Sequence, residues 1–485
     1  MRGRHLVHVV SIILLALAAA LALTTLVSLA YGDGDFLAFL GTTALTAALG
    51  FAGFRRTALE RDLTVREGYA VVAFSWIAIG IAGAVPFLLT GVTDSFIAAL
   101  FESVSGFTTT GASVFGDVEA LPRGILFWRS LTHWIGGMGI IVLGIAILPF
   151  LGVGGMQLFR AEVPGPTPER LQPRITQTAK LLWYVYAGLT VAQILLYLIG
   201  GMGPFDAVNH AFATLATGGF STRNASVGGY DSAYLQYVTI LFMYLAGINF
   251  TLHYRAVTGK PLRYFGDAEW RAYTVITLGA TLLVLLVALS SGDYAAFGLE
   301  RAFRNALFQV VSIATTTGFI SHDYELWPES THLVLLLLMF VGGMAGSTAG
   351  GMKVIRVYAF SRHGLIALRR SLHPRAILVS RIGRKPIRET DLLTILAFIL
   401  LYLGLFVAGA LALTLLGNDL VTSIGASAAT IGNVGPGLGL VGAVDNYGGL
   451  GPVSQLVCVF LMLAGRLEIF TILLLFHPDL WRRAR

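Results

Sequence analysis

The stretch Ser105-Gly-Phe-Thr-Thr-Thr-Gly-Ala-Ser113 (SGFTTTGAS) carries no charge and no large aliphatic side chain. It lies in a chain of 485 residues, of which 56% are hydrophobic and 12% charged, with a mean hydropathy of +0.76. Such a chain cannot bury its apolar side chains in one water-soluble core, so we expect an integral membrane protein. A run of glycine and threonine in this setting needs an explanation other than burial in lipid.

Apolar runs long enough to cross a bilayer recur along the whole chain. They cover residues 6–31, 35–53, 67–92, 124–151, 178–200, 233–254, 271–290, 331–362, 391–416 and 452–476. The sequence therefore predicts an all-α polytopic membrane protein. The first run follows the basic sequence MRGRH, as a signal peptide would, but it is long and lacks a convincing small-residue cleavage site, so we expect a retained helix.

The positions of Lys and Arg predict how the chain is oriented. With the N-terminus in the cytoplasm, 27 of the 33 basic residues fall in cytoplasmic segments, ten of them between Lys353 and Arg388. This is the bias that sets membrane orientation, so both termini are expected in the cytoplasm. The bias of Lys and Arg towards the cytoplasmic segments, together with the attraction of anionic membrane lipids, accounts for the net charge of +7. A nucleic-acid partner is therefore not needed to explain this charge. The single cysteine, Cys458, excludes an internal disulfide and a cysteine-based metal site.

The glycine and threonine stretch recurs three more times, at intervals of roughly one hundred residues. The further copies are ATLATGGFST at 213–222, SIATTTGFIS at 312–321 and ATIGNVGPGL at 429–438. We align the copies on Gly111, Gly218, Gly318 and Gly435. Each copy lies between two spanning runs and follows a short semi-apolar segment, such as Ser95 to Gly106, that could form a half-length helix. The predicted fold is therefore four pseudo-repeats of helix–pore loop–helix around a central pore, plus two extra N-terminal transmembrane helices.

Backbone that is not helical survives at membrane depth only where it is buried in protein or lines a wet cavity. Glycine lets carbonyl oxygens turn inward, threonine adds hydroxyl oxygens, and rings of such oxygens replace the water around a monovalent cation. Rings without a carboxylate suit potassium better than calcium or magnesium, which prefer charged ligands. A tight turn between helices is the alternative for any one copy, but four copies in register favour a cation filter.

These repeats also suggest how the chain divides into domains. The predicted units are a two-helix membrane domain at 1–66 and pore repeats at 67–176, 177–270, 271–388 and 389–485.

Several motifs together resemble those of one family. They are FTTTGAS, TGGFST, ATTTGF and IGNVGPGLG in the four copies, GGMAGSTAGGMKVIR from Gly342 to Arg356, and AGRLEIF from Ala464 to Phe470. Over essentially its full length the chain resembles potassium transporters of the Trk/Ktr/HKT superfamily, in particular bacterial potassium uptake proteins of the TrkH type. The resemblance implies a homodimer in the bacterial cytoplasmic (inner) membrane, with one pore in each protomer. It also implies a cytosolic nucleotide-binding regulatory subunit of the TrkA type, docked on the basic inner loops.

The resemblance and the repeats together assign the candidate site, with potassium as substrate and no organic cofactor in this chain. The expected filter, where K⁺ would bind, consists of Thr109, Thr110, Gly111, Ala216, Thr217, Gly218, Thr316, Thr317, Gly318, Asn433, Val434 and Gly435. The expected gate consists of Gly346, Ser347, Thr348, Ala349, Gly350, Gly351, Lys353 and Arg466.

The glycine-rich stretch from Gly342 to Lys353 nearly spells a phosphate-binding loop. Met352 stands where that motif has lysine, and a spanning helix rather than a strand precedes it, which argues against nucleotide binding. A helix broken below the filter explains the small residues better, because unwound backbone is tolerated beside a water-lined cavity. Close packing of helices through glycine and alanine is the alternative.

Arg466 is the only basic residue deep in a predicted span, so it must face the bundle interior and find acceptors there. Glu468, two positions on, points to another face of a helix, whereas the broken stretch offers free carbonyls. We expect Arg466 to donate to that stretch across the conduction path as a gate. A structural arginine that ties two helices together is the alternative.

Three alternatives concern function. A proton- or sodium-coupled symporter competes with a gated channel, which the scarcity of intramembrane carboxylates favours. An intramembrane enzyme lacks support, because no HExxH or plausible serine triad is present and His133 and His210 fit packing or pore-helix hydrogen bonds better. The basic cluster between Lys353 and Arg388 suits a regulatory partner or plain lipid headgroups.

Overall fold

The computed structural model describes residues 3–59, 63–146, 171–259, 262–290, 298–376, 378–383 and 385–481. Within these ranges the chain is helical apart from loops and one small hairpin of β1 (Arg381–Ile382) with β2 (Lys385–Pro386). Six of the described helices are long and apolar enough to cross a membrane, or up to eight if each of two bent pairs is one span. The predicted all-α polytopic membrane fold is confirmed.

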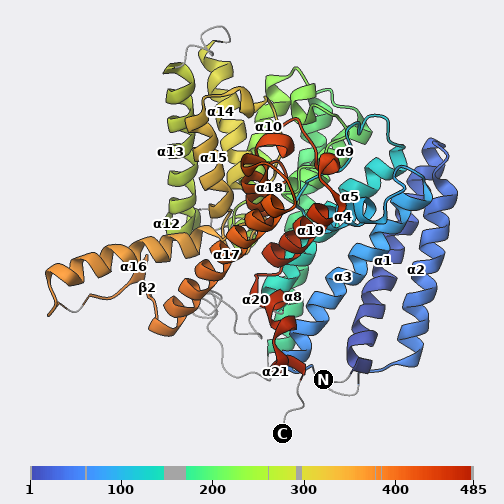
Figure 1. Ribbon diagram of the computed structural model, residues 1–485, viewed down its shortest axis with the longest axis horizontal. Helices are drawn as coiled ribbons and strands as arrows, with labels where there is room; N and C mark the ends of the chain where they lie inside the picture. The colour runs from blue at the N-terminus through green and yellow to red at the C-terminus, as the bar shows by residue number, and fades with distance from the viewer. Residues whose placement is uncertain are drawn as a thin grey trace.

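The two N-terminal helices form a hairpin on one side of the molecule (Figure 1). They are α1 (Gly3–Tyr31) and α2 (Phe36–Arg56), and α1 also contacts α3 (Val65–Leu89) and α5 (Arg123–Ala146). Both helices leave many leucines exposed on their outer faces, as lipid contact requires. They flank the bundle as the two extra helices of the prediction.

The remaining helices repeat one plan of span, short helix and span. The first repeat holds α3, α4 (Phe96–Phe107) and α5. The second repeat holds α8 (Leu171–Ile199), α9 (Pro204–Leu215), α10 (Ala233–Ala246) and α11 (Phe250–Val257), and the third holds α12 (Arg263–Gly266), α13 (Ala268–Ser290), α14 (Leu299–Ala314), α15 (Glu329–Val341) and α16 (Val354–Leu372). The fourth repeat holds α17 (Glu389–Leu415), α18 (Leu420–Gly432), α19 (Pro452–Arg466), α20 (Phe470–Leu473) and α21 (Pro478–Trp481). The exact domain limits stay a prediction.

Three of the four short helices, α4, α9 and α18, start from local signals, whereas α14 starts after Gly298 without a side-chain cap. The Ser95 hydroxyl accepts from the N–H of Ala98 at 3.3 Å to start α4, and Asp419 accepts from Thr422 at 3.0 Å to start α18. Pro204 opens α9 at a position where a missing N–H costs nothing. Each of the four short helices is then buried over most of its remaining length.

The four repeats close into a ring. Each short helix packs against both spans of its own repeat and against the second span of the preceding repeat: α9 against α5, α14 against α10, α18 against α15, and α4 against α19. The contact between α4 and α19 joins the first repeat to the last. Figure 1 shows α9, α14 and α18 in the upper half of the molecule, away from the end where the two chain termini lie.

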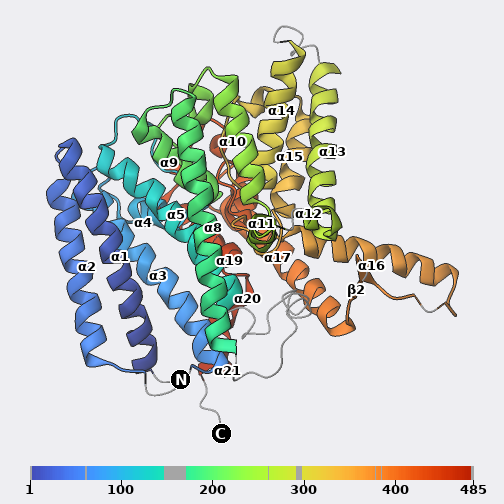
Figure 2. The ribbon, with the colours of Figure 1, turned by 180° about the vertical axis from the view of Figure 1, so that it is seen from behind.

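Three of the second spans are broken, where the sequence predicted one break. The helix axis turns by 103° between α10 and α11 and by 115° between α19 and the segment Phe470–Phe476. After α15, the stretch Gly342–Lys353 (the intramembrane loop) is unwound, and α16 leaves the bundle sideways (Figures 1 and 2). The predicted continuous runs 233–254 and 452–476 are therefore wrong in detail, whereas the break predicted within run 331–362 is present. Run 124–151 is helical to Ala146, and its remainder lies outside the described residues.

The last break has a packing cause that composition does not reveal. A Cβ on Gly465 would overlap the carbonyl oxygen of Ile431, so α19 approaches α18 closely at this point. Just beyond it, Glu468 (φ 60°) and Ile469 (φ 51°) take the left-handed conformation that side chains disfavour. Tertiary contacts, rather than a glycine or proline, therefore end this helix.

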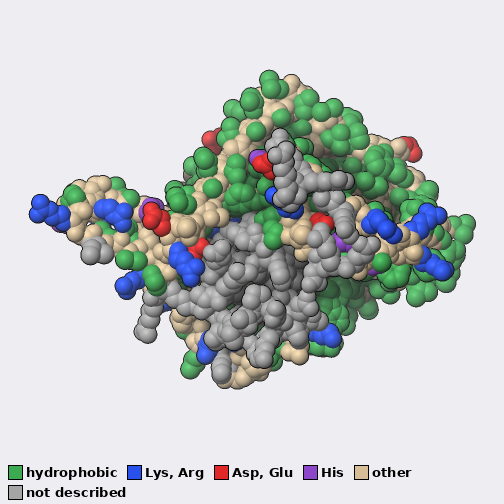
Figure 3. All heavy atoms as spheres, turned by 90° about the horizontal axis from the view of Figure 1, so that it is seen from below, with side chains coloured by type: hydrophobic (Ala, Val, Ile, Leu, Met, Phe, Trp, Pro, Cys, Tyr) green, Lys and Arg blue, Asp and Glu red, His purple; other side chains and the backbone are tan. Residues whose placement is uncertain are grey.

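The start of α1 and helix α21 lie at the same end of the molecule, the lower end in Figures 1 and 2. Helix α16 projects near this end, and Figure 3 shows Lys and Arg side chains along it. Arg362, Arg369 and Arg370 of α16 are all exposed. The basic face expected from the sequence is thus present on the described part of this surface.

Candidate functional site

The four glycine segments have the same backbone conformation. Each short helix ends in a residue with left-handed φ, followed two positions later by a glycine with positive φ. The left-handed residues are Thr109, Thr217, Thr316 and Asn433, at φ 52°, 54°, 56° and 53°, and the glycines are Gly111, Gly219, Gly318 and Gly435, at φ 81°, 79°, 76° and 99°. A β-branched threonine in this region is strained, and strain of this kind persists where the surrounding structure enforces it, often at functional sites.

This common conformation corrects the alignment of the second copy. Gly219, not Gly218, occupies the position of Gly111, and the hydrogen bonds agree, because the N–H groups of Gly218 and Thr110 make the same contact, to the carbonyls of Ala213 and Ser105. The residues that correspond to Thr109, Thr110 and Gly111 are therefore Thr217, Gly218 and Gly219, so the predicted set Ala216, Thr217 and Gly218 lies one residue early relative to the other segments. Because TGGF contains two adjacent glycines, the sequence alone does not show which of them corresponds to Gly111.

The segments pack against one another in cyclic order. A Cβ on Gly111 would overlap the carbonyl oxygen of Gly218, one on Gly219 that of Thr317, and one on Gly318 that of Val434. A Cβ on Gly435 would lie 2.6 Å from the carbonyl oxygen of Thr110, which closes the circle. The carbonyls of Thr110, Gly218, Thr317 and Val434 are equivalent atoms of the four segments, so they form a ring at one level, which we call the filter ring.

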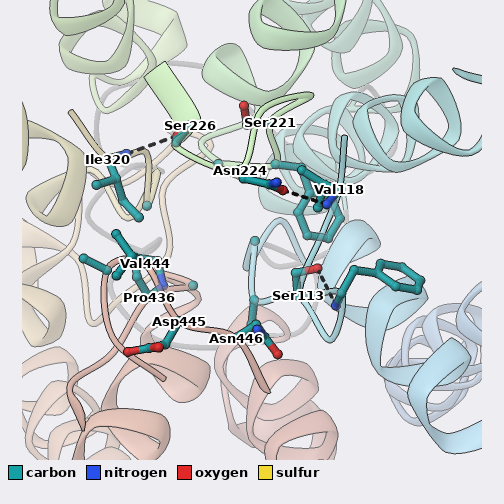
Figure 4. A pocket seen from close by; sticks show the side chains of 18 of the residues that line it. Ser113, Val118, Ser221, Asn224, Ser226, Ile320, Pro436, Val444, Asp445 and Asn446 are labelled. Carbon is teal, nitrogen blue, oxygen red and sulfur yellow. Dashed lines mark hydrogen bonds between the residues drawn. The ribbon is translucent and has the colours of Figure 1, made fainter. Parts of the chain in front are cut away.

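A cavity of about 130 Å³ lies on the outer side of the filter ring and is lined by all four segments. Figure 4 looks into it, with residues of the four repeats on four sides. Ser113 and Val118 come from the first repeat, Ser221, Asn224 and Ser226 from the second, Ile320 from the third, and Pro436, Val444, Asp445 and Asn446 from the fourth. Hydrogen bonds between repeats stabilise the walls of this cavity, such as the one from Val118 N–H to the side-chain Oδ1 of Asn224 at 2.7 Å.

The threonines differ between segments in their contacts. Thr108 and Thr110 share a hydrogen bond of 2.7 Å, and Thr315 and Thr317 share an equivalent one. The second and fourth segments have no such pair of hydroxyls. Instead, the amide of Asn433 donates to Thr110 at 3.0 Å and to the carbonyl of Met462 at 2.9 Å. The ring is therefore only approximately fourfold.

A buried ion pair braces the outer end of the first segment. Arg129 donates to Glu102 at 2.7 Å, and both side chains are at most 2% exposed. Arg129 also donates to Ser113 and to the carbonyl of Ser221, each at 3.2 Å, and lies over the Phe220 ring. This network links the first segment to the second.

In the second and fourth repeats, different residues hold the outer end of the segment in place. His210 lies nine positions before Gly219, as Glu102 does before Gly111, and it contacts the Ser221 hydroxyl at 2.9 Å. In the fourth repeat, Gly439 N–H donates to Glu325 of the outer loop at 2.7 Å, and burial raises the pKa of that carboxyl.

His133 makes no hydrogen bond among the described residues and stacks on Phe220 at 4.1 Å. Packing or pore-helix hydrogen bonds were expected for both histidines, and the structure shows packing for His133 and hydrogen bonds for His210.

The intramembrane loop lies directly beneath the segments and is buried. Gly350 N–H donates to the Thr316 hydroxyl at 2.6 Å, and Gly351 N–H donates to the carbonyl of Gly432 at 3.0 Å. The Thr348 hydroxyl donates to the carbonyl of Leu215 at 2.9 Å. The loop therefore contacts the inner ends of three of the four short helices.

Arg466 reaches the loop from α19. Its Nη1 donates to the carbonyl of Thr348 at 2.7 Å, with the side chain 3% exposed, and Lys353 donates to the carbonyl of Ala349. The expected contact between Arg466 and the loop is thus present. Among the described residues, Nε and Nη2 of Arg466 have no hydrogen-bond partner, so most of the charge remains unneutralised. Glu468 turns away, as expected, and pairs with Arg356 of α16.

Known proteins share this architecture over the whole chain. Residues 36–483 match the TrkH family model, described as a cation transport protein. The chain is 40% identical over 492 residues to the Trk system potassium uptake protein TrkH of Vibrio parahaemolyticus, covering 99% of this chain and 100% of that one. It is 39% identical to TrkH of Escherichia coli K12 over 99% of this chain and the full relative, and 34% identical to TrkG of the same organism over 94% of each.

A solved structure shows the same fold. The crystal structure of the potassium transporter TrkH from Vibrio parahaemolyticus superimposes with a TM-score of 0.91 at 38% identity, covering 99% of this chain and 100% of that chain. The chain therefore belongs to the TrkH family of cation transport proteins.

Proposed function

We propose that the chain takes up potassium across the bacterial cytoplasmic membrane. The observation that carries this proposal is the filter ring, in which four equivalent carbonyl oxygens come from four segments packed in cyclic order. Such a ring replaces the hydration shell of a weakly hydrated monovalent cation. The C-terminal ends of four short helices also face the ring, and their partial negative charge favours a cation. The relatives named as potassium uptake proteins support the choice of ion.

The proposed filter residues follow the corrected alignment. They are Thr109, Thr110 and Gly111; Thr217, Gly218 and Gly219; Thr316, Thr317 and Gly318; and Asn433, Val434 and Gly435. Because Asn433 and Val434 break the fourfold pattern, discrimination against sodium is expected to be looser than in a strictly symmetric pore.

The intramembrane loop and Arg466 form the proposed gate. Residues Gly346–Gly351, with Lys353, fill the space beneath the segments, and the Arg466 charge lies on the same path. The loop blocks the path sterically, and the partly unpaired guanidinium repels a cation. Release of the loop would open the path.

Regulation from the cytoplasm completes the proposal. The exposed arginines of α16 would dock a cytosolic nucleotide-binding subunit of the TrkA type, and the protein would act as a homodimer with both termini inside. Helix α16 follows directly from the loop, so a partner bound to it can pull on the gate. Anionic lipid binding is the competing use of these arginines.

Passive flow is favoured over coupled symport. Glu102 is paired with Arg129 and Glu468 with Arg356, so neither carboxylate is available as a proton carrier. No enzymatic activity is proposed.

Purified protein in liposomes tests the proposal. Potassium flux should exceed sodium flux and should persist without a proton gradient, and Arg466→Ala should raise both. A flux that requires the proton gradient would favour the symporter, and an absence of potassium flux in folded wild type and Arg466→Ala alike would refute the assignment.

A further inference from the structure

Glu269 is a buried carboxylate that belongs to neither the filter nor the proposed gate. It lies in the first turn of α13 and is 7% exposed. Its Oε1 accepts two backbone N–H groups, that of Ala345 at 2.7 Å and that of Ile355 at 3.2 Å. Sequence reasoning gave this residue no role.

The two amides lie at opposite ends of the intramembrane loop. Ala345 is near its beginning, where Met344 N–H also donates to the carbonyl of Gly247 at 2.9 Å. Ile355 lies just beyond its end, in the first turn of α16. One carboxylate oxygen therefore holds both ends of the loop against α13.

A buried carboxyl group needs hydrogen-bond donors for its oxygens, because an unpaired polar atom away from water is costly. The N–H groups of Ala345 and Ile355 supply two such donors to the same oxygen. Helix capping alone does not explain the arrangement, since the shorter of the two bonds goes to Ala345, which is outside α16.

The position of α16 determines what happens to the loop when the contact between Glu269 and Ile355 breaks. The helix projects from the bundle (Figures 1 and 2), and its N-terminal turn packs against α13 and α17. A displacement of α16 that breaks the bond to Ile355 leaves the carboxylate with one partner fewer and loosens the hold on Ala345. Motion of α16 is thereby transmitted to the beginning of the loop as well as to its end.

We infer that Glu269 is a positioning residue that clamps both ends of the intramembrane loop, so that the loop is released only when α16 moves away from α13. This inference rests on the proposed function for its effect on flux, but the clamp itself can be measured without any ion.

Hydrogen–deuterium exchange on the full chain in nanodiscs measures the clamp. In Glu269→Ala, peptides that contain Ala345 and Ile355 should exchange about tenfold faster or more, since each amide loses its hydrogen-bond acceptor. Glu269→Gln keeps an acceptor oxygen and should give an intermediate rate. The control is Glu389→Gln, which removes an exposed carboxylate from the first turn of another span, α17, and should leave both peptides unchanged.

Flux in liposomes measures the consequence. Without a partner, Glu269→Ala should raise potassium flux about tenfold with an unchanged potassium to sodium ratio, whereas a merely structural role would lower flux or alter the ratio. Combined with Arg466→Ala, the increase should be less than the product of the two single effects, because both side chains hold the same loop.

Unchanged exchange at both peptides in Glu269→Ala would overturn the inference. So would faster exchange with unchanged flux in protein that transports. Faster exchange in a protein that transports no potassium in any variant would uphold the clamp and refute the proposed function instead.

Discussion

The backbone N–H of Gly350 donates to the hydroxyl oxygen of Thr316 across 2.6 Å, which joins the intramembrane loop to a residue of the filter. Thr316 has the left-handed conformation shared by Thr109, Thr217 and Asn433. A hydroxyl that accepts this bond has one lone pair fewer for a cation. On the proposed function, we therefore predict that the position of the loop is linked to ion binding at Thr316, and that each opposes the other.

Replacing Thr316 tests this link. Thr316→Val leaves the Gly350 N–H without an acceptor, which destabilises the closed loop by about 1–3 kcal/mol and should raise basal potassium flux. Thr316→Ser should keep the flux low. Thr109→Val is the matched control, because the Thr109 hydroxyl has no partner among the described residues. An increase of equal size in Thr109→Val would contradict the link.

The corrected alignment makes Gly218 and Gly219 behave differently. Gly219→Ala places a Cβ against the carbonyl of Thr317 in a conformation with positive φ, so potassium selectivity should be lost and no neighbouring side-chain change should restore it. Gly218→Ala meets only the His133 ring, so the double variant with His133→Ala should recover selectivity. The measurement is the potassium to sodium flux ratio. Recovery in the Gly219 variant instead would restore the alignment on Gly218.

Arg466→Ala should raise potassium flux about tenfold or more by removing both the bond to Thr348 and the charge on the path. Arg466→Lys keeps the positive charge but lacks the planar guanidinium group, so its potassium flux should lie between that of the wild type and that of Arg466→Ala. Removal of Gly346–Gly350 should have an effect similar to Arg466→Ala. Both variants must remain inserted and fold with the wild-type melting profile, and unchanged flux under that condition would refute the gate.

The ion pair of Glu102 and Arg129 should contribute strongly to stability. Arg129→Met leaves a buried, uncompensated carboxylate and should lower the free energy of unfolding by about 3–5 kcal/mol, measured as a drop in Tm in detergent. Arg304→Met provides the comparison, since its partner Glu300 is 58% exposed and such pairs contribute about 1 kcal/mol or less. Equal shifts in Tm would show that Arg129 acts only through packing on Phe220.

Much of this architecture follows from composition and repetition. Ten apolar runs and four glycine segments predict the spans and the ring, because membrane depth admits few backbone solutions. The glycine-rich stretch Gly342–Lys353 predicted the break after α15, but the sequence did not reveal the breaks after α10 and α19. Glu468 and Ile469 are ordinary helix residues, and their left-handed conformation depends on tertiary contacts such as the pair of Glu468 with Arg356. Nor does any local pattern connect Glu269 to Ala345, which lie far apart in the chain and meet only through folding.

The contact between α4 and α19 also governs when the pore can exist during synthesis. The first segment of the filter emerges from the ribosome long before α19, the helix that completes its surroundings, has been made. The contact that closes the ring thus joins two helices that lie far apart in the sequence, and contacts of this kind form late in folding. A partly translated chain therefore lacks the closed ring of four segments that the proposed function requires for selective passage of potassium.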